Sequence, residues 1–394
     1  MKKQHRVALL IESSNAYGRG LLHGVVAYVR EHRPWSFHFV EQGRGDAPPE
    51  WLADWDGDGI IARIENKRIA KAIAASGLPT VDISAARLIP TLPWVETNDE
   101  AIAKMVAEHL LERGFRHFGF CGDARFNWSQ WRGRHFSEAI RKAGFECAVH
   151  QPRETRQVRV EAQIAGIGAW LRTLPKPVGI MACYDIRAQQ VLASCRGQGL
   201  AVPDEAAVVG VDNDELLCDL CSPPLSSVLP NHQKAGYEAA RLLDRMMSGL
   251  KVAPAAHLIE PVRLAIRQSS DVLAVHDADV AKAMHLIRTH ACDGIDVSDI
   301  LKGVPVSRRV LESRFKNLLG ITPHQEILRV KLNRVKQLLV DTNLSLLEIA
   351  RRTGFAHVEY LSVSFKRETG KTPRRYRGGA QLRGVQPEDS QPNA

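Results

Sequence analysis

Apolar positions in the first 270 residues alternate between short runs and longer stripes. The short runs are rich in β-branched residues and predict strands at residues 7–11, 36–40, 59–62, 80–83, 117–121, 146–150, 179–182 and 207–211. The longer segments have helical spacing and predict helices at residues 18–31, 99–113, 131–143, 187–198 and 233–248. Alternation of strand and helix is typical of βαβ units, whose parallel sheets carry helices on both faces. We therefore expect an α/β domain over residues 1–270.

The pattern changes after the last strand-like segment, residues 258–267. Ser269, Ser270 and Asp271 end that segment, and Asp277 or Asp279 can cap a new helix. The spacing is then helical as far as residue 377, and the glycines and prolines of residues 378–394 predict a disordered tail. The predicted organisation is an α/β domain at 1–270, a linker at 271–278, an all-α domain at 279–377 and the tail.

The all-α domain contains one local arrangement twice. The two copies span residues 297–319 and 346–369. Each has a short helix, a turn near Gly303 or Gly354, and a second helix that ends at Gly320 or Gly370. Two helix-turn-helix units are therefore predicted. A helix that starts at Pro323 and runs to about residue 340 joins them and would set the two recognition helices about one DNA turn, roughly 34 Å, apart.

The second helix of each unit has an apolar face and a polar face. Leu311, Phe315 and Leu318 form the apolar face in the first unit, and Leu361 and Phe365 form it in the second. The polar faces supply the predicted DNA-binding residues, which are Arg308, Arg309, Glu312, Ser313, Lys316, Val358, Glu359, Ser362, Val363 and Lys366. Arginine can bond bidentately to guanine, glutamate accepts from cytosine, valine contacts the thymine methyl group, and lysine suits phosphates.

Positive charge is concentrated in the same domain. The chain carries 53 Lys and Arg against 44 Asp and Glu, a net charge of +9. Residues 278–377 carry 19 against 10, so the excess lies in about a quarter of the chain. This asymmetry indicates a polyanionic partner, double-stranded DNA. A plain helical bundle with a basic surface is the alternative, which the duplicated unit disfavours.

Short motifs between residues 280 and 377 carry a family resemblance. They are Ser307, Leu311, Phe315-Lys316, Gly320-Ile321-Thr322-Pro323, Glu348-Ile349-Ala350, Gly354-Phe355, Phe365-Lys366, Gly370-Lys371-Thr372-Pro373 and Tyr376-Arg377. The segment resembles the AraC/XylS family of transcription regulators. The resemblance implies sequence-specific DNA binding, a homodimer and, for an activator, RNA polymerase as a partner. Val363 departs from the family pattern, because relatives often carry a basic residue there.

Polar and aromatic residues follow several predicted strands of the α/β domain. Ligands bind beyond the carboxyl ends of parallel strands, and a sugar needs charged groups for its hydroxyls and flat rings for its C–H surface. The predicted ligand-binding residues are Tyr17, Trp128, Arg132, Asp185, Asp212 and Asn213. These residues have alternative roles. The aspartates could cap helices, Arg132 could form a surface ion pair, and the aromatic rings could pack in the core.

The α/β domain carries a second resemblance, through Ala16-Tyr17, Arg19 and the run Val209-Gly210-Val211-Asp212-Asn213. It resembles the two-lobed, type I periplasmic-binding-protein-like core of the LacI family, which implies Arg132, Asp185 and Asp212 as the main ligand contacts. The two resemblances together imply a sugar-responsive regulator, with D-xylose as the expected effector and xylose catabolic genes as the targets. Another small effector on the same scaffold is the alternative.

An enzyme is the competing class. Gly18, Gly20 and Gly24 follow the first strand, with Glu41 as a candidate ribose partner, which suggests a dinucleotide-binding oxidoreductase. The spacing G-x-G-x-x-x-G and the six residues before Gly18 do not fit that tight turn. No convincing catalytic arrangement is found either, so we expect no enzyme activity, no cofactor and no metal.

The remaining features bear on location and redox state. The apolar run after the basic N-terminus is too short for a signal peptide, and no run approaches a membrane span. A cytoplasmic protein without membrane contact is therefore expected, with its seven cysteines reduced. Cys218 and Cys221 form a C-x-x-C, which is predicted to be a buried pair and alternatively a redox couple.

Overall fold

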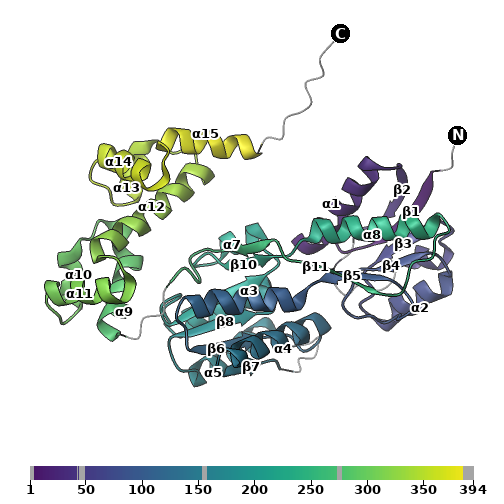
Figure 1. Ribbon diagram of the computed structural model, residues 1–394, viewed down its shortest axis with the longest axis horizontal. Coiled ribbons are helices and arrows are strands. Elements are labelled where there is room, and N and C mark those ends of the chain that lie inside the picture. Colours follow the sequence, from purple (N-terminus) through teal and green to yellow (C-terminus); the bar gives the residue numbers. More distant parts are fainter. Residues whose placement is uncertain (1–3, 42, 44–48, 153–157, 273–276, 385–394) are drawn as a thin grey trace, which may run out of the picture. The chain divides into compact units, whose positions relative to one another are not determined.

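The computed structural model describes residues 4–41, 43, 49–152, 158–272 and 277–384 (Figure 1). The chain divides into two compact units, Met1–Ala274 and Val275–Ala394. This division falls within the predicted linker, of which residues 273–276 lie outside the described residues.

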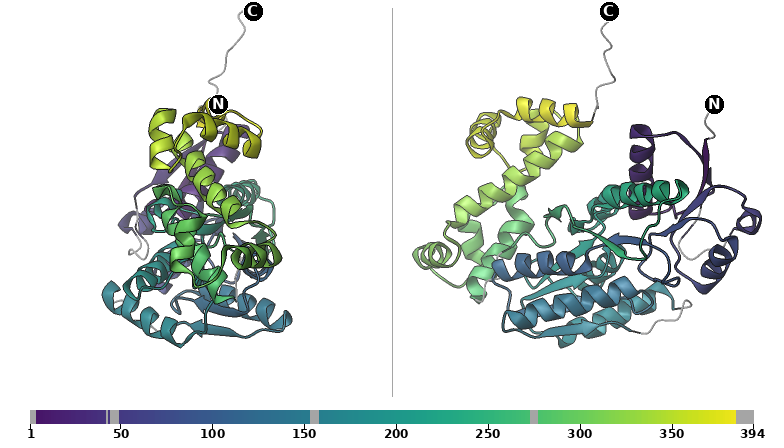
Figure 2. Two further views of the ribbon diagram at one scale, coloured as in Figure 1. Left: turned by 90° about the vertical axis from the view of Figure 1, so that its left-hand side faces the viewer. Right: turned by 45° about the vertical axis from the view of Figure 1, so that its right-hand side comes forward.

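The first unit contains two lobes, each built on one six-stranded sheet (Figure 2). The N-lobe, residues 5–97 and 232–259, has the strand order β11-β5-β4-β3-β1-β2. Its strands are β1 (His5–Leu10), β2 (Trp35–Phe39), β3 (Gly59–Ala62), β4 (Thr80–Asp82), β5 (Trp94–Thr97) and β11 (Ala256–Ile259). All neighbouring strands of this sheet are parallel.

The C-lobe, residues 99–229 and 263–272, has the order β12-β10-β9-β8-β6-β7. Its strands are β6 (His117–Cys121), β7 (Cys147–His150), β8 (Val178–Ala182), β9 (Ala206–Val211), β10 (Ser226–Leu229) and β12 (Arg263–Ala265). Only the pair of β10 and β12 is antiparallel among the described pairs. The chain crosses between the lobes after β5, β10 and β11, so both lobes depend on segments distant in sequence.

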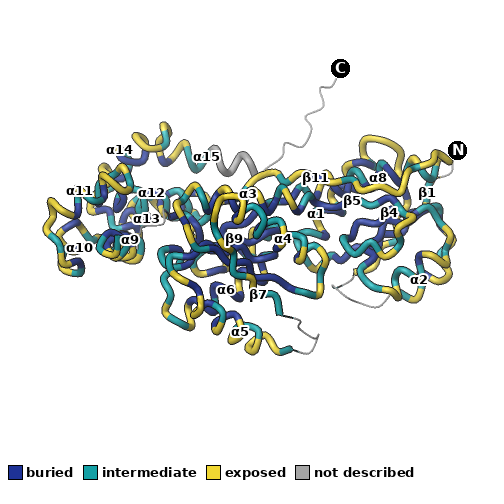
Figure 3. The backbone as a smooth tube through the Cα atoms, turned by 60° about the horizontal axis from the view of Figure 1, so that its bottom comes forward, coloured by how far each residue is buried: buried dark blue, intermediate teal, exposed yellow. Residues whose placement is uncertain are grey.

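Helices cover both faces of each sheet, as the alternating pattern predicts. In the N-lobe, α1 (Ala16–Glu31) and α8 (His232–Met247) cover one face, while η1 (Glu50–Asp54) and α2 (Lys67–Ser76) cover the other. In the C-lobe, α3 (Asp99–Glu112) and α4 (Asn127–Lys142) lie opposite α5 (Val160–Thr173) and α6 (Asp185–Gly197), with α7 (Glu215–Leu220) following β9. Central strands such as β4 and β9 are consequently buried on both faces (Figure 3).

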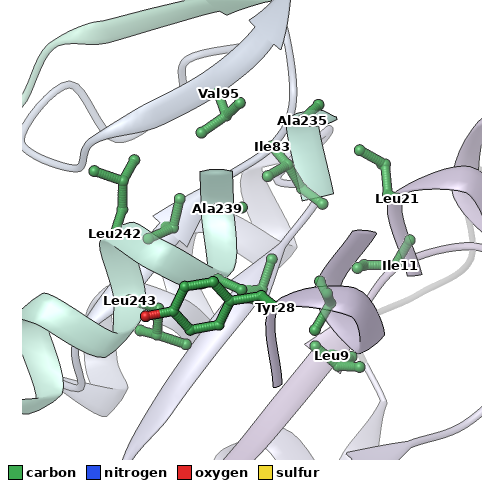
Figure 4. Packing of buried hydrophobic residues seen from close by; sticks show 14 of the residues in the cluster. Leu9, Ile11, Leu21, Tyr28, Ile83, Val95, Ala235, Ala239, Leu242 and Leu243 are labelled. Carbon is green, nitrogen blue, oxygen red and sulfur yellow. The ribbon is translucent and has the colours of Figure 1, made fainter. Parts of the chain in front are cut away.

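The period-two alternation of β1 explains how one strand serves two cores. Val7, Leu9 and Ile11 point into the cluster beneath α1 and α8, and Ala8 and Leu10 point into the opposite cluster. Figure 4 shows the first cluster, where Leu21 and Tyr28 of α1 and Leu242 and Leu243 of α8 pack over the sheet.

Glycines allow α1 and α8 to approach closely. A Cβ atom on Gly24 would lie 2.0 Å from the carbonyl oxygen of Gln233, and one on Gly236 would lie 2.0 Å from that of Leu21. A Cβ on Gly20 would meet His232 at 2.8 Å. Gly18, Gly20 and Gly24 lie inside α1, which begins at Ala16, and not in a loop before it. Gly20 and Gly24 therefore serve helix packing, and the three glycines do not form a dinucleotide-binding turn.

The second unit contains only helices and their connections in its described residues, 277–384. Its elements are α9 (Ala278–His290), η2 (Ala291–Asp293), α10 (Val297–Gly303), α11 (Arg308–Leu319), α12 (Pro323–Asp341), α13 (Leu346–Arg352), α14 (Val358–Thr369) and α15 (Pro373–Gly384). Helix α10 with α11 and α13 with α14 form the two predicted helix-turn-helix units. Gly320 and Gly370 end the second helices in left-handed conformation, each with φ 71°, which glycine adopts without strain.

Helix α12 connects two separate cores in this unit. Ile327 near its start belongs to a cluster with α9, α10 and α11, whereas Leu332, Val335 and Leu339 belong to a cluster with α13 and α14. Thr322 caps the helix, with its hydroxyl accepting from the Gln325 backbone N–H at 3.2 Å and its own N–H donating to the Gln325 side chain at 2.8 Å. Each helix-turn-helix unit thus has its own hydrophobic support.

Several predictions about secondary structure and burial were wrong. Residues 258–267 form two strands in different lobes, because Pro261 interrupts them. Leu318 is 52% exposed and is not part of the apolar face of α11. Helix α15 continues to Gly384, so the predicted disorder is wrong for residues 378–384, while residues 385–394 lie outside the described residues.

Two further observations concern the cysteines and the membrane. All seven cysteines are free thiols, and Cys218 and Cys221 are buried, which supports packing over a redox role. Burial raises the pKa of Cys221 to about 11, so the thiol stays protonated at neutral pH. No helix in the described part of the chain is both long and apolar enough to cross a membrane.

Candidate ligand cleft and DNA-binding surface

A cavity in the first unit is lined by both lobes. The N-lobe contributes Tyr17, Arg63, Ile83, Ala85, Glu96 and Thr97, and the C-lobe contributes Asp99, Trp128, Arg132 and Asp212. The empty space between these side chains, including the part open to solvent at its mouth, is about 430 Å³. Its lining residues lie at the carboxyl ends of strands or in the first turns of the helices that follow, where open parallel sheets bind ligands.

Four of the six predicted ligand residues line this cavity. They are Tyr17, Trp128, Arg132 and Asp212. Asp185 and Asn213 are not among the lining residues. Asp185 Oδ1 accepts from Ser227 Oγ at 2.6 Å and its Oδ2 accepts from the Asp214 N–H at 2.9 Å, while Asn213 Oδ1 accepts from Arg267 Nη1 at 2.9 Å.

Asp185 and Asn213 instead support the loop that carries Asp212. Asp212 and Asn213 both have positive φ, 108° and 46°, a conformation that needs support from its surroundings. The Asp212 N–H donates to the Val228 carbonyl at 3.0 Å, and the Asn213 N–H donates to Ser227 Oγ at 3.0 Å. Burial and then the charge of Asp212 raise the pKa of Asp185, while the hydrogen bonds from Ser227 and Asp214 oppose this shift.

Arg132 is a buried and hydrogen-bonded charge of the cleft. Only 4% of its surface is exposed, and its Nε donates to Asp99 Oδ1 and its Nη1 to the Cys183 carbonyl, both at 2.7 Å. Its guanidinium carbon lies 5.0 Å from the centre of the Trp128 ring. Burial lowers the pKa of Arg132, but Asp99 and Asp212 outweigh this effect and raise it overall. The side chain therefore remains a fixed cation.

Tyr17 and Arg63 form the corresponding group in the N-lobe. Arg63 donates from Nη1 to Glu12 Oε1 at 2.6 Å, also pairs with Glu65, and lies 5.1 Å from the Tyr17 ring. Burial raises the pKa of Tyr17 to about 12, so its hydroxyl keeps its proton and can donate. The cleft thus presents donors and acceptors from both lobes.

Three charged lining residues were missed by sequence reasoning, namely Arg63, Glu96 and Asp99. Arg63 follows the correctly predicted strand β3, so its position alone could have identified it. Glu96 was missed because β5 was not predicted. Asp99 begins α3 and resembles any acidic residue in a first helical turn.

The predicted DNA-facing residues of α11 lie largely on the surface. Arg308, Arg309, Ser313 and Lys316 are exposed, and Glu312 is partly exposed. Arg308 Nε donates to Glu312 Oε1 at 2.9 Å, and Lys316 Nζ donates to the Gly320 carbonyl at 2.8 Å. Arg309 forms no hydrogen bond or ion pair with the described residues, so its guanidinium is available to a partner.

Helix α14 presents a less polar surface. Val363 is 65% exposed, Glu359 and Lys366 are exposed, and Ser362 is partly exposed. Val358 differs, because it packs partly against the cluster that contains Leu361 and Phe365. The exposed valine is thus Val363, which can contact thymine methyl groups in the major groove.

Family models match three segments of the chain. Residues 6–100 match the XylR N-terminal domain, residues 107–270 match the periplasmic binding protein-like domain, and residues 301–379 match a helix-turn-helix domain. These matches confirm the predicted fold class, with a two-lobed α/β unit followed by a helical unit.

Sequence similarity to known proteins extends over nearly the whole chain. The xylose operon regulatory protein of Escherichia coli strain K12 is 34% identical, with 95% of this chain and 97% of that protein covered. Its counterpart in Haemophilus influenzae is 31% identical, with 95% and 99% covered. A solved structure of the xylose-binding transcription activator xylR superposes with a TM-score of 0.81 at 33% identity, covering 96% of this chain and 99% of that one. The chain therefore belongs to the family of xylose operon regulatory proteins, which are helix-turn-helix transcription regulators and not enzymes.

Proposed function

We propose that the chain is a D-xylose-dependent activator of xylose catabolic genes and that its effector binds in the interlobe cleft. The observation that carries the proposal is the balance of charge around this cavity. Its lining contains two cationic residues, Arg63 and Arg132, and three acidic residues, Glu96, Asp99 and Asp212. A neutral polyol can donate its hydroxyls to the carboxylates and accept from the guanidinium groups, whereas a phosphorylated ligand would meet repulsion.

The roles of the individual side chains follow from their chemistry. Asp212 accepts from sugar hydroxyls, and Arg132 donates to a ring or hydroxyl oxygen. Trp128 and Tyr17 offer flat faces to the C–H surface of the ring. Asp185 and Asn213 contribute by holding the Asp212 loop and not by direct contact.

A ligand that touches both lobes favours their closed arrangement, because its affinity differs between the open and closed states. In a homodimer, this closure would change how the helix-turn-helix units are presented to an operator and to RNA polymerase in the cytoplasm. The similarity to a protein described as a xylose-binding transcription activator supports D-xylose as the effector and activation, not repression, as the response.

DNA recognition is assigned to α11 and α14. Arg309 reads a base, since its guanidinium is exposed and makes no hydrogen bond or ion pair with the described residues. Lys366 contacts phosphate, and Val363 contacts a thymine methyl group. Arg308 and Glu312 already pair with each other, so they must exchange this contact for DNA or act together.

Calorimetric titration of the full chain with D-xylose, L-arabinose, D-ribose and D-glucose tests the effector, with NAD as the control for an oxidoreductase. We expect D-xylose to bind at least tenfold more tightly than the other sugars and NAD not to bind. If none of the four sugars bound, the assignment of the cleft to a sugar would be rejected, but the family assignment would stand. Tighter binding of another sugar would replace D-xylose on the same scaffold.

A further inference from the structure

Arg87 joins the two lobes at the edge of the cleft. It lies in the N-lobe between β4 and β5, and its guanidinium carbon is 5.0 Å from the ring centre of Trp94 in the same lobe. It is also 4.5 Å from the ring centre of Trp131, which belongs to α4 in the C-lobe. Its backbone has φ 49°, an unusual conformation for a residue with a side chain. A cation between two aromatic faces from different lobes stabilises their contact.

The same arginine binds a carboxylate of the cavity wall. Glu96 is 6% exposed, and its Oε1 accepts a hydrogen bond from Arg87 Nη2. Its other oxygen, Oε2, is buried and has no hydrogen-bond partner among the described residues. A buried carboxylate oxygen without a donor is unfavourable. Glu96 lines the cavity, so a rotation of its side chain that turns Oε2 toward the cleft would let a ligand hydroxyl satisfy this oxygen, in competition with the nearby Trp94 indole N–H.

The first turns of α4 connect Arg87 and Glu96 to the part of the cavity wall that α4 forms. Trp128 and Arg132 line the cavity, and Trp131 lies between them in sequence without being a lining residue. Asn127, the first residue of α4, adds a second interlobe contact, with its Nδ2 donating to the Ala85 carbonyl at 3.4 Å. One helical segment therefore carries both ligand contacts and lobe contacts.

We propose that Glu96 is a ligand-binding residue that shares its carboxylate between the ligand and Arg87, and that Arg87 is a positioning residue that connects an occupied cleft to Trp131. The ligand and the opposite lobe would then reinforce each other, because both require the same orientation of Glu96 and Arg87. This proposal rests on the proposed function, since it takes the occupant of the cleft to be a polyol.

The test is a double-mutant cycle on D-xylose affinity in the full chain, using Trp131→Leu, Arg87→Leu and both together. Each single change should weaken D-xylose binding about tenfold. Because both changes remove the same contact, the double variant should bind no more than about twofold more weakly than the weaker of the two single variants. Arg87→Lys keeps the charge but loses the planar stacking, so it should fall between Arg87→Leu and the unaltered protein.

Arg6→Leu is the matched control, because Arg6 pairs with Asp56 at 2.8 Å and lies 5.2 Å from Trp55, with all three residues in the N-lobe. It should leave the affinity within twofold. Thermal unfolding of each variant verifies that it is folded. An affinity for Trp131→Leu within twofold of the unaltered protein would overturn the proposal, because Trp131 acts only through the connection.

Hydrogen exchange tests the contact between Arg87 and Trp131 without a bound sugar. If no sugar binds the unaltered protein, the proposed function fails, but the Arg87 connection still predicts faster amide exchange at residues 84–88 in Trp131→Leu than in Arg6→Leu. Equal exchange in the two variants would reject the connection itself.

Discussion

Arg132 Nε donates to Asp99 Oδ1 at 2.7 Å, and this ion pair ties the first turns of α4 and α3 together beside the cleft. Both side chains are nearly fully buried, with exposed fractions of 4% and 7%. Burial raises the pKa of Asp99, and the charge of Arg132 opposes that shift. Neither charge is stable in this position without the other.

Replacing Arg132 with methionine should therefore affect both stability and ligand binding. Asp99 would be left as an unpaired buried carboxylate, so urea unfolding should show a loss of about 3 kcal/mol. D-xylose binding should also disappear in calorimetry. Arg241→Met is the matched control, since Arg241 is 40% exposed and pairs with Glu238 on the surface of α8. It should change the unfolding free energy by less than about 1 kcal/mol. Equal effects of the two changes would contradict a special role for Arg132.

A second prediction separates the two aspartates that the family resemblance implied. Asp212 lines the cavity, whereas Asp185 lies behind it and accepts hydrogen bonds from Ser227 and Asp214. Asp212→Asn should reduce D-xylose affinity by tenfold or more while leaving DNA affinity without sugar unchanged. Asp185 does not line the cavity, so Asp185→Asn should leave the affinity within about threefold. If Asp185→Asn lost as much affinity as Asp212→Asn, Asp185 would have to be returned to the ligand site.

The sequence predicted the fold class well because its signals are local. All eight predicted strands correspond to observed strands with ends displaced by no more than two residues, and both helix-turn-helix units occupy the predicted ranges. The missed strands, β5 and β10, are short and contain Glu96, Ser226 and Ser227, so their composition resembles that of a loop. Tertiary contacts with neighbouring strands stabilise these segments, and such contacts are not visible in a sequence window.

The ligand site was less predictable, because strand ends identify a position but not the direction of a side chain. Asp185 and Asp212 both follow strands, yet only Asp212 lines the cavity. The backbone at Asp212 has a positive φ of 108°, and the sequence carries no glycine there to signal that conformation. Interlobe partners such as Arg87 and Trp131 are distant in sequence, so only the folded chain brings them together.

A third prediction concerns base reading against phosphate binding. Arg309→Ala should lower affinity for the preferred operator by roughly 1–3 kcal/mol and relax preference at one base position. Lys366→Ala should weaken binding to all sequences alike and reduce the salt dependence by about one counterion. Titrations against a set of mutated operators at several salt concentrations would distinguish them. Uniform losses across the operators for Arg309→Ala would assign that residue to the phosphate backbone. Lys316 is less suitable for this test, because it also binds the C-terminal carbonyl of Gly320.

The fourth prediction follows from Asp82, which is completely buried in β4. Its Oδ1 accepts from the Ser84 N–H at 2.8 Å, while its Oδ2 has no partner among the described residues. Burial raises the pKa of Asp82 to about 7, although the hydrogen bonds from Ser84 oppose the shift. The unfolded chain ionises near pH 4, so the folded state loses stability as the pH rises from about 4 to about 7.

Asp82→Asn removes this titration and keeps the acceptor for Ser84. The unfolding free energy of the variant minus that of the unaltered protein should therefore increase by about 3 kcal/mol between pH 5 and pH 8. Burial lowers the pKa of His109 to about 3 and that of His232 to about 4. These two histidines therefore have the opposite pH dependence, because they reduce the stability of the fold as the pH falls below about 6.5. Both histidines are present in both proteins, so the difference isolates Asp82. Asp56→Asn, at an exposed position of the same lobe, should show a constant difference. A constant difference for Asp82→Asn as well would mean that Asp82 is ionised throughout this range.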